Sequence, residues 1–181
     1  FEWLKMSKKL KNLKFIGISF LFLSILSAYL LRNSQGFETF LFVVCVSILT
    51  DLGGYIFGKT FKGPKLTKIS PNKTYSGFIG SFIFSLFGGL IYLEYFPGTL
   101  LWSYAEGYAS YIEYNLFTLS IILIVSLTSQ IGDLMISYFK RKAKIKDTGN
   151  MLPGHGGLLD RIDGIILAVP ISYVILHFNI Y

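Results

Sequence analysis

Residues 116–139 read LFTLSIILIVSLTSQIGDLMISYF, and this stretch decides the class of fold. A helix needs about 20 apolar residues to cross a hydrocarbon core of ~30 Å, and this stretch is long enough. Its polar residues recur every three or four positions and therefore share one helical face: Ser126, Ser129, Gln130, Asp133 and Ser137. Such a face points to the interior of a bundle or to a water-filled cavity.

Four further apolar segments flank this stretch, at residues 15–31, 39–57, 77–96 and 162–178. Lipid offers no partners to backbone polar groups, so helix is the expected structure for each. The chain of 181 residues is 52% hydrophobic with a mean hydropathy of +0.56, values typical of an integral membrane protein. We predict an all-α, polytopic membrane bundle of about five transmembrane helices.

Basic residues fall almost entirely on one side of this five-helix arrangement. Of the 17 Lys and Arg residues, 16 lie before the first segment, between the second and third, or between the fourth and fifth. Arg32 is the exception. The positive-inside rule makes the basic side cytoplasmic. The net charge of +7 is thus explained by membrane orientation, and we expect no nucleic-acid partner.

The polar stretch between the fourth and fifth segments, residues 137–163, reads SYFKRKAKIKDTGNMLPGHGGLLDRID. Its cations suit phosphates, its carboxylates suit a hard metal ion, and its glycines allow close backbone approach. These are the parts of a phosphoryl-transfer site, and their place at a membrane surface suggests a lipid phosphate as a substrate.

Plainer interpretations of the same residues stay open. The basic run at 140–146 is also what a membrane anchor on anionic lipid requires. Asp160 could cap a helix whose dipole Asp163 complements. His155 suits a turn, a phosphate contact or a proton transfer equally well. Asp51, at the cytoplasmic end of the second segment, is explained by reaching headgroup water. The chain has no cysteine or histidine cluster that would suit zinc.

Three stretches together resemble the phosphatidate cytidylyltransferases, also called CDP-diacylglycerol synthases. Residues 137–163 look like the full C-terminal signature of that family. Residues 51–55, DLGGY, followed by Gly58, resemble its Asp-x-Gly-small-Tyr motif. Residues 70–77, SPNKTYSG, resemble its Ser-Pro-Lys-Lys-Thr-Trp-Glu-Gly motif, with Asn72, Tyr75 and Ser76 as departures. Bacterial members usually have more spanning helices upstream, so we expect that this chain lacks some.

The resemblance implies the reaction and its participants. CTP and phosphatidic acid would give CDP-diacylglycerol and pyrophosphate for phospholipid biosynthesis, with Mg²⁺ as cofactor and a second cation left open. Asp133 and Asp160 would be the principal metal ligands, with Asp163 in support. Lys146 would join the first two as a catalytic residue. The residues implied for substrate binding are Ser70, Lys73, Thr74, Lys140, Arg141, Asp147, His155, Gly156, Gly157 and Arg161.

The expected organisation follows from these points. Residues 1–14 form a basic cytoplasmic segment, and residues 15–181 form the transmembrane catalytic bundle. The resemblance implies the bacterial inner (plasma) membrane, with the active site facing the cytoplasm, and a homo-oligomer is left open. Two alternatives remain: the same chemistry on another lipid or polyprenyl phosphate, or a small transporter that uses the polar face as its pathway. A transporter would not release pyrophosphate from CTP.

Overall fold

The computed structural model describes residues 2–7, 11–67, 69–96, 99–100, 116–149 and 156–178. Within these ranges the chain is helical and contains no strand, so the predicted all-α class is confirmed. His155 and nearly all of the outer loop at 96–115 lie outside the described residues. The helices, in chain order, are α1 (Glu2–Ser7), α2 (Lys11–Phe61), α3 (Tyr75–Tyr95), α4 (Leu116–Lys142), α5 (Leu159–Ile162) and α6 (Ile165–Phe178).

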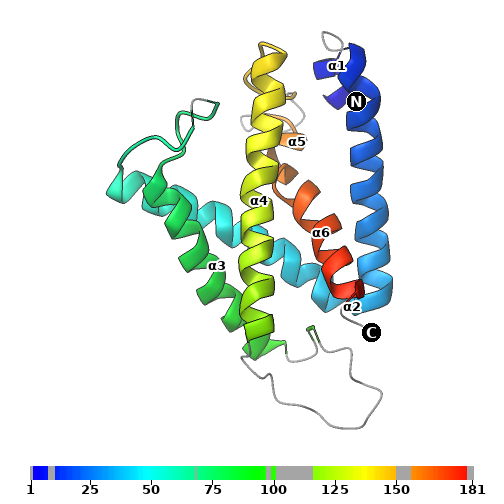
Figure 1. The fold of residues 1–181 in the computed structure, drawn as a ribbon, viewed down its shortest axis with the longest axis vertical. Helices are drawn as coiled ribbons and strands as arrows, with labels where there is room; N and C mark the ends of the chain where they lie inside the picture. Colours follow the sequence, from blue (N-terminus) through cyan, green and yellow to red (C-terminus); the bar gives the residue numbers. More distant parts are fainter. Residues whose placement is uncertain are drawn as a thin grey trace.

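The long helix α2 contains the first two predicted segments, 15–31 and 39–57, joined at Gly36. Gly36 has φ +86° and ψ 165°, a backbone conformation that essentially only glycine adopts. In Figure 1 the two halves of α2 diverge from this bend and run back toward the same end of the molecule. A glycine at one position therefore divides one long helix into two arms that run in different directions.

The predicted number of five spanning helices is approximate. Among the described residues, three helices are long and apolar enough to cross a membrane, and one of them is the bent α2. The fifth segment was predicted from residue 162, but α6 begins at Ile165 and has only 14 residues. The short helix α5 and a turn at Asp163 and Gly164 precede it.

Helix α3 packs closely against the second half of α2 because small residues line both surfaces. A Cβ atom added to Gly77 would lie 2.7 Å from the carbonyl oxygen of Gly54, and one added to Gly80 would collide with Phe57. Gly77, Ser81, Ser85 and Gly89, four apart, are all buried on α3. Close approach of two backbones needs such residues, and here it brings the start of α3 against α2.

Helix α4 occupies the middle of the bundle and contacts α2, α3 and α6 (Figure 1). Its polar face is buried as predicted: Ser126 and Ser129 are fully buried, and Gln130 and Ser137 nearly so. Thr50 of α2 donates a hydrogen bond to Ser126 at 3.0 Å. The polar face therefore joins helices inside the bundle.

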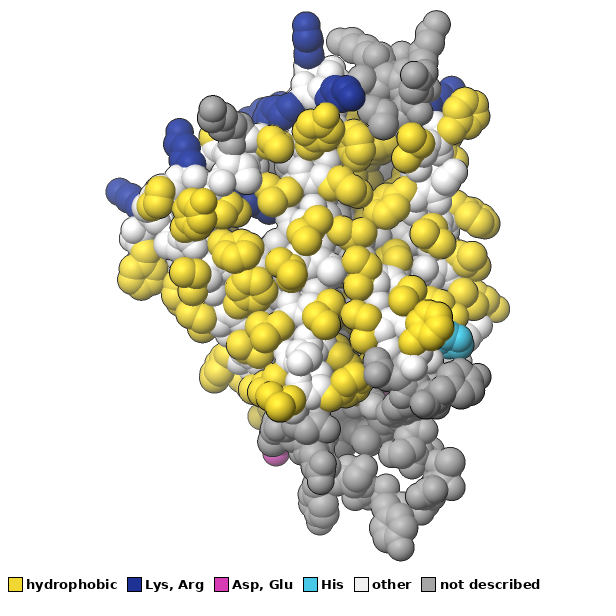
Figure 2. Space-filling model, viewed as in Figure 1, with side chains coloured by type: hydrophobic (Ala, Val, Ile, Leu, Met, Phe, Trp, Pro, Cys, Tyr) yellow, Lys and Arg dark blue, Asp and Glu magenta, His cyan; other side chains and the backbone are white. Residues whose placement is uncertain are grey.

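The outer surface fits a lipid environment. Large apolar side chains are exposed along α2, α3 and α4. Figure 2 shows them over the middle of the visible face, with Lys and Arg side chains at the end where α4 finishes. Helix α1, the loop before α3 and the C-terminal end of α4 lie toward this end (Figure 1).

Helix α1 packs onto the bundle. Trp3 and Met6 are buried in a cluster with Ile136, Leu159 and Ile166. The division between a segment at 1–14 and a bundle from 15 stays a prediction, although α2 already begins at Lys11.

Candidate functional site

A cavity of about 300 Å³ lies between α2, α3, α4 and the loop that connects α2 to α3. The loop contributes Ser70, Lys73 and Thr74, which the sequence predicted as substrate-binding residues. Helix α4 contributes Asp133, one of the three predicted metal ligands. The remaining lining residues are Asp51, Gly54, Tyr55, Leu66, Asn72, Gly77, Phe78, Ser81 and Gln130.

The loop is folded by short-range bonds that place the start of α3 at this cavity. The backbone N–H of Leu66 donates to Lys73 O at 2.8 Å, and Thr74 caps α3 by accepting from Gly77 N at 3.1 Å. The first N–H groups of a helix lack intrahelical partners and favour anions. Thr74 therefore has a structural role as the cap besides lining the cavity.

Ser76, which stands where the resembled motif has glutamate, donates its hydroxyl to the carbonyl oxygen of Lys62. The first turn of α3 is thereby tied to the end of α2. This contact gives Ser76 a structural role and assigns it no part of a glutamate's chemistry.

Lys73 forms an ion pair with Asp133 across the cavity. Their side chains are about one quarter exposed, 26% and 24% respectively. Ser137, one turn further along α4, donates to the other carboxylate oxygen of Asp133 at 3.3 Å. The loop motif at 70–77 and the polar face of α4, which lie far apart in the sequence, thus meet in one contact.

Two more carboxylates lie near Asp133. Asp163, Asp133 and Asp51 lie close enough to interact electrostatically with one another. Asp163 also accepts from Gly164 N at 2.9 Å and is 7% exposed. The sequence left Asp51 out of the predicted site, although the DLGGY motif that contains it was a usable signal. This acidic cluster is partly balanced by Lys73 and Lys140.

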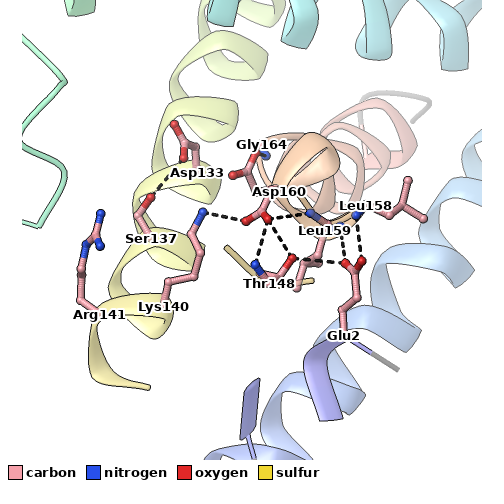
Figure 3. Close-up of polar contacts among 12 residues, drawn as sticks. Glu2, Asp133, Ser137, Lys140, Arg141, Thr148, Leu158, Leu159, Asp160 and Gly164 are labelled. Atoms are coloured by element: carbon pink, nitrogen blue, oxygen red, sulfur yellow. Dashed lines mark hydrogen bonds and ion pairs between the residues drawn. The ribbon is translucent and has the colours of Figure 1, made fainter. Parts of the chain in front are cut away.

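Asp160 is the centre of a second group of contacts, shown in Figure 3. Lys140 donates to its Oδ1 at 2.8 Å. Its Oδ2 accepts from Thr148 N at 2.9 Å, from Thr148 Oγ1 at 3.0 Å and from Gly157 N at 3.0 Å. Partial burial alone would raise the pKa of Asp160, but the bonds from Lys140, Thr148 and Gly157 outweigh it and hold that pKa below its usual range.

Asp160 and Asp163 are three residues apart but contact different partners. Asp160 accepts from Thr148 and Gly157, whereas Asp163, at the C-terminal end of α5, accepts from Gly164 N. Lys140 connects the two groups, because it forms an ion pair with Asp160 and also attracts Asp163 electrostatically.

Glu2 is a member of this group that the sequence interpretation missed. Its carboxylate accepts from Leu158 N at 2.9 Å, from Leu159 N at 2.8 Å and from Thr148 Oγ1 at 3.2 Å (Figure 3). The available signal was one acidic residue in an otherwise basic N-terminal stretch.

The remaining predicted residues lie around these two groups. Arg141 donates through Nε to Ile69 O at 3.4 Å, which places it beside the loop that holds Ser70. Lys146, Asp147 and Arg161 are exposed. Gly156 has φ +88°, a left-handed conformation that favours glycine. The N–H of Gly157, expected to face phosphate, is directed to Asp160.

The donor set suits a hard divalent ion by its chemistry, since carboxylate oxygens are the ligands that Mg²⁺ prefers. Among the described residues, however, no three acidic, cysteine or histidine side chains converge closely enough to hold an ion as they stand. Asp133 is engaged with Lys73, and Asp160 with Lys140. The predicted ligand set of Asp133, Asp160 and Asp163 stays a prediction.

Fold and site together define a polytopic helical membrane protein with a charge-lined cavity toward its basic end. Comparison with known sequences gives the family. The family model described as "Cytidylyltransferase family" matches residues 3–179, and the chain belongs to this family.

Several curated proteins named phosphatidate cytidylyltransferase are similar to the chain. The protein from Rickettsia bellii is 38% identical over 179 residues, which cover 96% of this chain and 73% of that protein. The protein from Brucella suis biovar 1 is 37% identical over 161 residues, 87% of this chain and 54% of that protein. The protein from Staphylococcus saprophyticus is 37% identical over 171 residues, with shares of 92% and 57%. The chain thus spans little more than half the length of the last two.

Proposed function

We propose that this chain transfers a cytidylyl group from CTP to phosphatidic acid, giving CDP-diacylglycerol and pyrophosphate. The family and the names of its relatives support the reaction class. The observation that carries the proposal is the cavity in which Lys73 meets Asp133. A cation, a carboxylate and a helix N-terminus facing one cavity suit a triphosphate and its metal ion.

In the proposed reaction an oxygen of the lipid phosphate attacks the α-phosphorus of CTP. A phosphorus–oxygen bond forms, the bond from the α-phosphorus to the bridging oxygen breaks, and pyrophosphate leaves with that electron pair. Such a transfer needs positioning and charge neutralisation more than covalent help from the protein. Lys73 and the N-terminus of α3 would hold the nucleotide phosphates, and Lys140 and Arg141 would hold the lipid phosphate.

Asp133 and Asp163 would hold Mg²⁺, with Asp51 close by on the cavity wall. The resemblance implies Asp133 and Asp160 as the principal ligands and Asp163 as a supporting one, so Asp160 is proposed as a ligand as well. The ion would neutralise charge on the triphosphate. For Asp133 to take part, Lys73 must leave it, and an incoming phosphate is the natural new partner for that lysine.

Position in the membrane fits the same proposal. The apolar surface agrees with an integral membrane protein. The basic end, where Asp160 and Lys140 lie, would face the cytoplasm of a bacterium by the positive-inside rule. Both substrates could then be reached, because CTP is cytoplasmic and phosphatidic acid lies in the adjacent leaflet. An assembly of several copies stays open.

The decisive experiment incubates the purified chain, in vesicles that contain phosphatidic acid, with CTP and Mg²⁺. We expect CDP-lipid and pyrophosphate in equal amounts, and loss of both when the divalent ion is chelated. A polyprenyl phosphate tested in parallel separates the alternative substrate class. Formation of neither product from either lipid would overturn the proposal for this chain.

A kinetic series separates phosphate binding from membrane anchoring in the basic stretch. Lys142 and Lys144 fall at variable positions of the resembled signature, whereas Lys146 falls at a specified one. Neutral substitution at Lys142 or Lys144 should matter little, since a lysine near anionic lipid is worth only ~1 kcal/mol. The same change at Lys146 should raise KM for CTP or lower kcat. Equal losses at all three, rescued by more anionic lipid, would leave the stretch as an anchor.

A further inference from the structure

The side chain of Glu2 connects the beginning of the chain to the loop before α5. Its two carboxylate oxygens accept the N–H groups of Leu158 and Leu159 at 2.9 and 2.8 Å. These are orphan donors of a short helix, because the N-cap residue of α5 is Leu158 and offers no side-chain hydrogen bond. Glu2 therefore caps α5 from a distant part of the sequence.

Helix α1 is packed into the bundle, and this packing holds Glu2 in place. The neighbouring Trp3 is 5% exposed and meets the ring of Phe139 edge to face at 5.4 Å. The indole N–H of Trp3 donates to Lys14 O at 3.2 Å. A side chain at Gly17 would collide with the indole, so α2 has a glycine where the ring lies.

The signature loop is shaped to receive this carboxylate. A Cβ atom at Gly149 would lie 2.8 Å from Glu2 Oε1. One at Gly157 would lie 2.8 Å from Glu2 Oε2 and would collide with Thr148. These two glycines therefore leave room for Glu2, a role that phosphate binding alone would not have suggested.

Thr148 links Glu2 to Asp160. Its hydroxyl lies 3.0 Å from Asp160 Oδ2 and 3.2 Å from Glu2 Oε2, and it carries a single proton for the two carboxylates. Asp160 accepts a hydrogen bond from the N–H of Gly157, and Glu2 accepts from the next two N–H groups, those of Leu158 and Leu159. Three consecutive amides are thus shared between two carboxylates, one of which pairs with Lys140.

We propose that Glu2 is a positioning residue for cytidylyl transfer: it holds the loop so that Asp160 faces Lys140. The inference rests on the proposed function, and it adds α1 to the parts of the protein that assemble the site. Glu2 itself touches no reacting atom in this scheme. Its effect passes through Thr148 and the amides of the loop.

The test compares Glu2→Ala and Glu2→Gln in the full chain, with Glu38→Ala as the matched control. Glu38 is exposed and lies two residues after Gly36, at the bend of α2, which is at the opposite end of the bundle from α5 (Figure 1). Two quantities are measured: hydrogen exchange of the peptide that contains residues 156–162, and kcat and KM for CTP per folded molecule. The first reports on the contact itself, and the second on its consequence for the reaction.

We expect Glu2→Ala to speed amide exchange in that peptide by about tenfold or more, because two N–H groups lose their acceptor. We expect kcat to fall about tenfold, with a smaller change in KM for CTP. Glu2→Gln should be intermediate, since it keeps one acceptor oxygen. Glu38→Ala should match wild type in both measurements.

Substitution of Thr148 provides an independent arm. Thr148→Ser keeps the hydroxyl and should retain kcat, whereas the nearly isosteric Thr148→Val should lower it without changing the amount of folded protein. Faster exchange in Glu2→Ala with unchanged kcat would overturn the positioning role, as would unchanged exchange. An inactive wild-type chain whose exchange still responds to Glu2→Ala would instead overturn the proposed function and leave the contact standing.

Discussion

At the scale of single residues, the ion pair between Lys73 and Asp133 connects structure and proposed chemistry. Lys73 was predicted from the loop motif and Asp133 from the polar face of a helix, and the fold joins them. The positive charge of Lys73 and the negative charge of Asp133 neutralise each other at a partly buried position. Removal of Lys73 alone would therefore leave Asp133 near two other carboxylates, Asp51 and Asp163, with less positive charge to balance them.

We predict that Asp133→Asn lowers turnover about a thousandfold, because a ligand to the ion that stabilises the transition state is lost. The same change should lower stability by about 1 kcal/mol, since Lys73 loses its partner. The double variant Lys73→Met, Asp133→Asn should recover much of the melting temperature and none of the activity. Turnover and thermal unfolding in detergent measure the two effects. A single variant that keeps more than about a tenth of wild-type activity would exclude Asp133 as an essential ligand.

The lowered pKa of Asp160 leads to a prediction about how stability depends on pH. Because its pKa is lowered in the folded protein, the unfolded chain binds this proton more readily. The stabilising effect is therefore complete above the usual aspartate value of about 3.9 and is lost as the pH falls through the lowered pKa. Asp160→Asn should flatten the acid side of the stability profile, measured by unfolding between about pH 6 and pH 3. Parallel profiles for wild type and variant would contradict this.

At the scale of helices, close packing of α2 and α3 sets the cavity wall. Gly54, Gly77 and Gly80 let the two backbones meet, and Thr74 starts α3 at the right residue. Because Gly54 and Gly77 also line the cavity, packing and site share the same residues. A substitution that disturbs the packing of α3 against α2 should therefore also disturb the cavity.

We predict that Gly77→Ala destabilises the protein by about 2 kcal/mol and weakens CTP binding, since its Cβ meets the backbone oxygen of Gly54. Gly88→Ala on the same helix is the control, because its Cβ meets only the end of the flexible Leu49 side chain. Thermal unfolding and nucleotide titration compare the two. If Gly88→Ala proves as harmful as Gly77→Ala, backbone approach is not the cause.

At the scale of the whole molecule, the bend at Gly36 and the placement of charge decide how the chain lies in a membrane. The bend turns α2 back toward the end from which it started, so the loop before α3 and the C-terminal end of α4, both with exposed basic residues, lie toward the same end (Figures 1 and 2). The acidic groups around Asp133 and Asp160 face the same end. The site and the cationic surface are thus on one side.

We predict that labels will reach this end from the cytoplasm. Single cysteines at Lys65 and Lys144, introduced after Cys45 has been replaced by serine, should react with an impermeant thiol reagent only from the cytoplasmic side. A cysteine at Glu106 should react only from the other side, because 16 of 17 basic residues favour this orientation. Labelling of Lys65→Cys and Glu106→Cys from the same side would contradict the topology.

The sequence alone determined the helical class, the inward polar face of α4 and the residues of three motifs. These features depend on composition and on local periodicity, which a sequence displays directly. It also indicated that Ser70, Lys73, Thr74 and Asp133 belong to a site, by resemblance. Only the tertiary structure placed these four residues in one cavity and put Asp160 in a separate group of contacts with Lys140 and Thr148. It alone brought Asp51 and Glu2 to them, because the contact between Glu2 and Leu159 joins residues 157 positions apart. Contacts of that kind follow from how helices pack, and no local pattern encodes them.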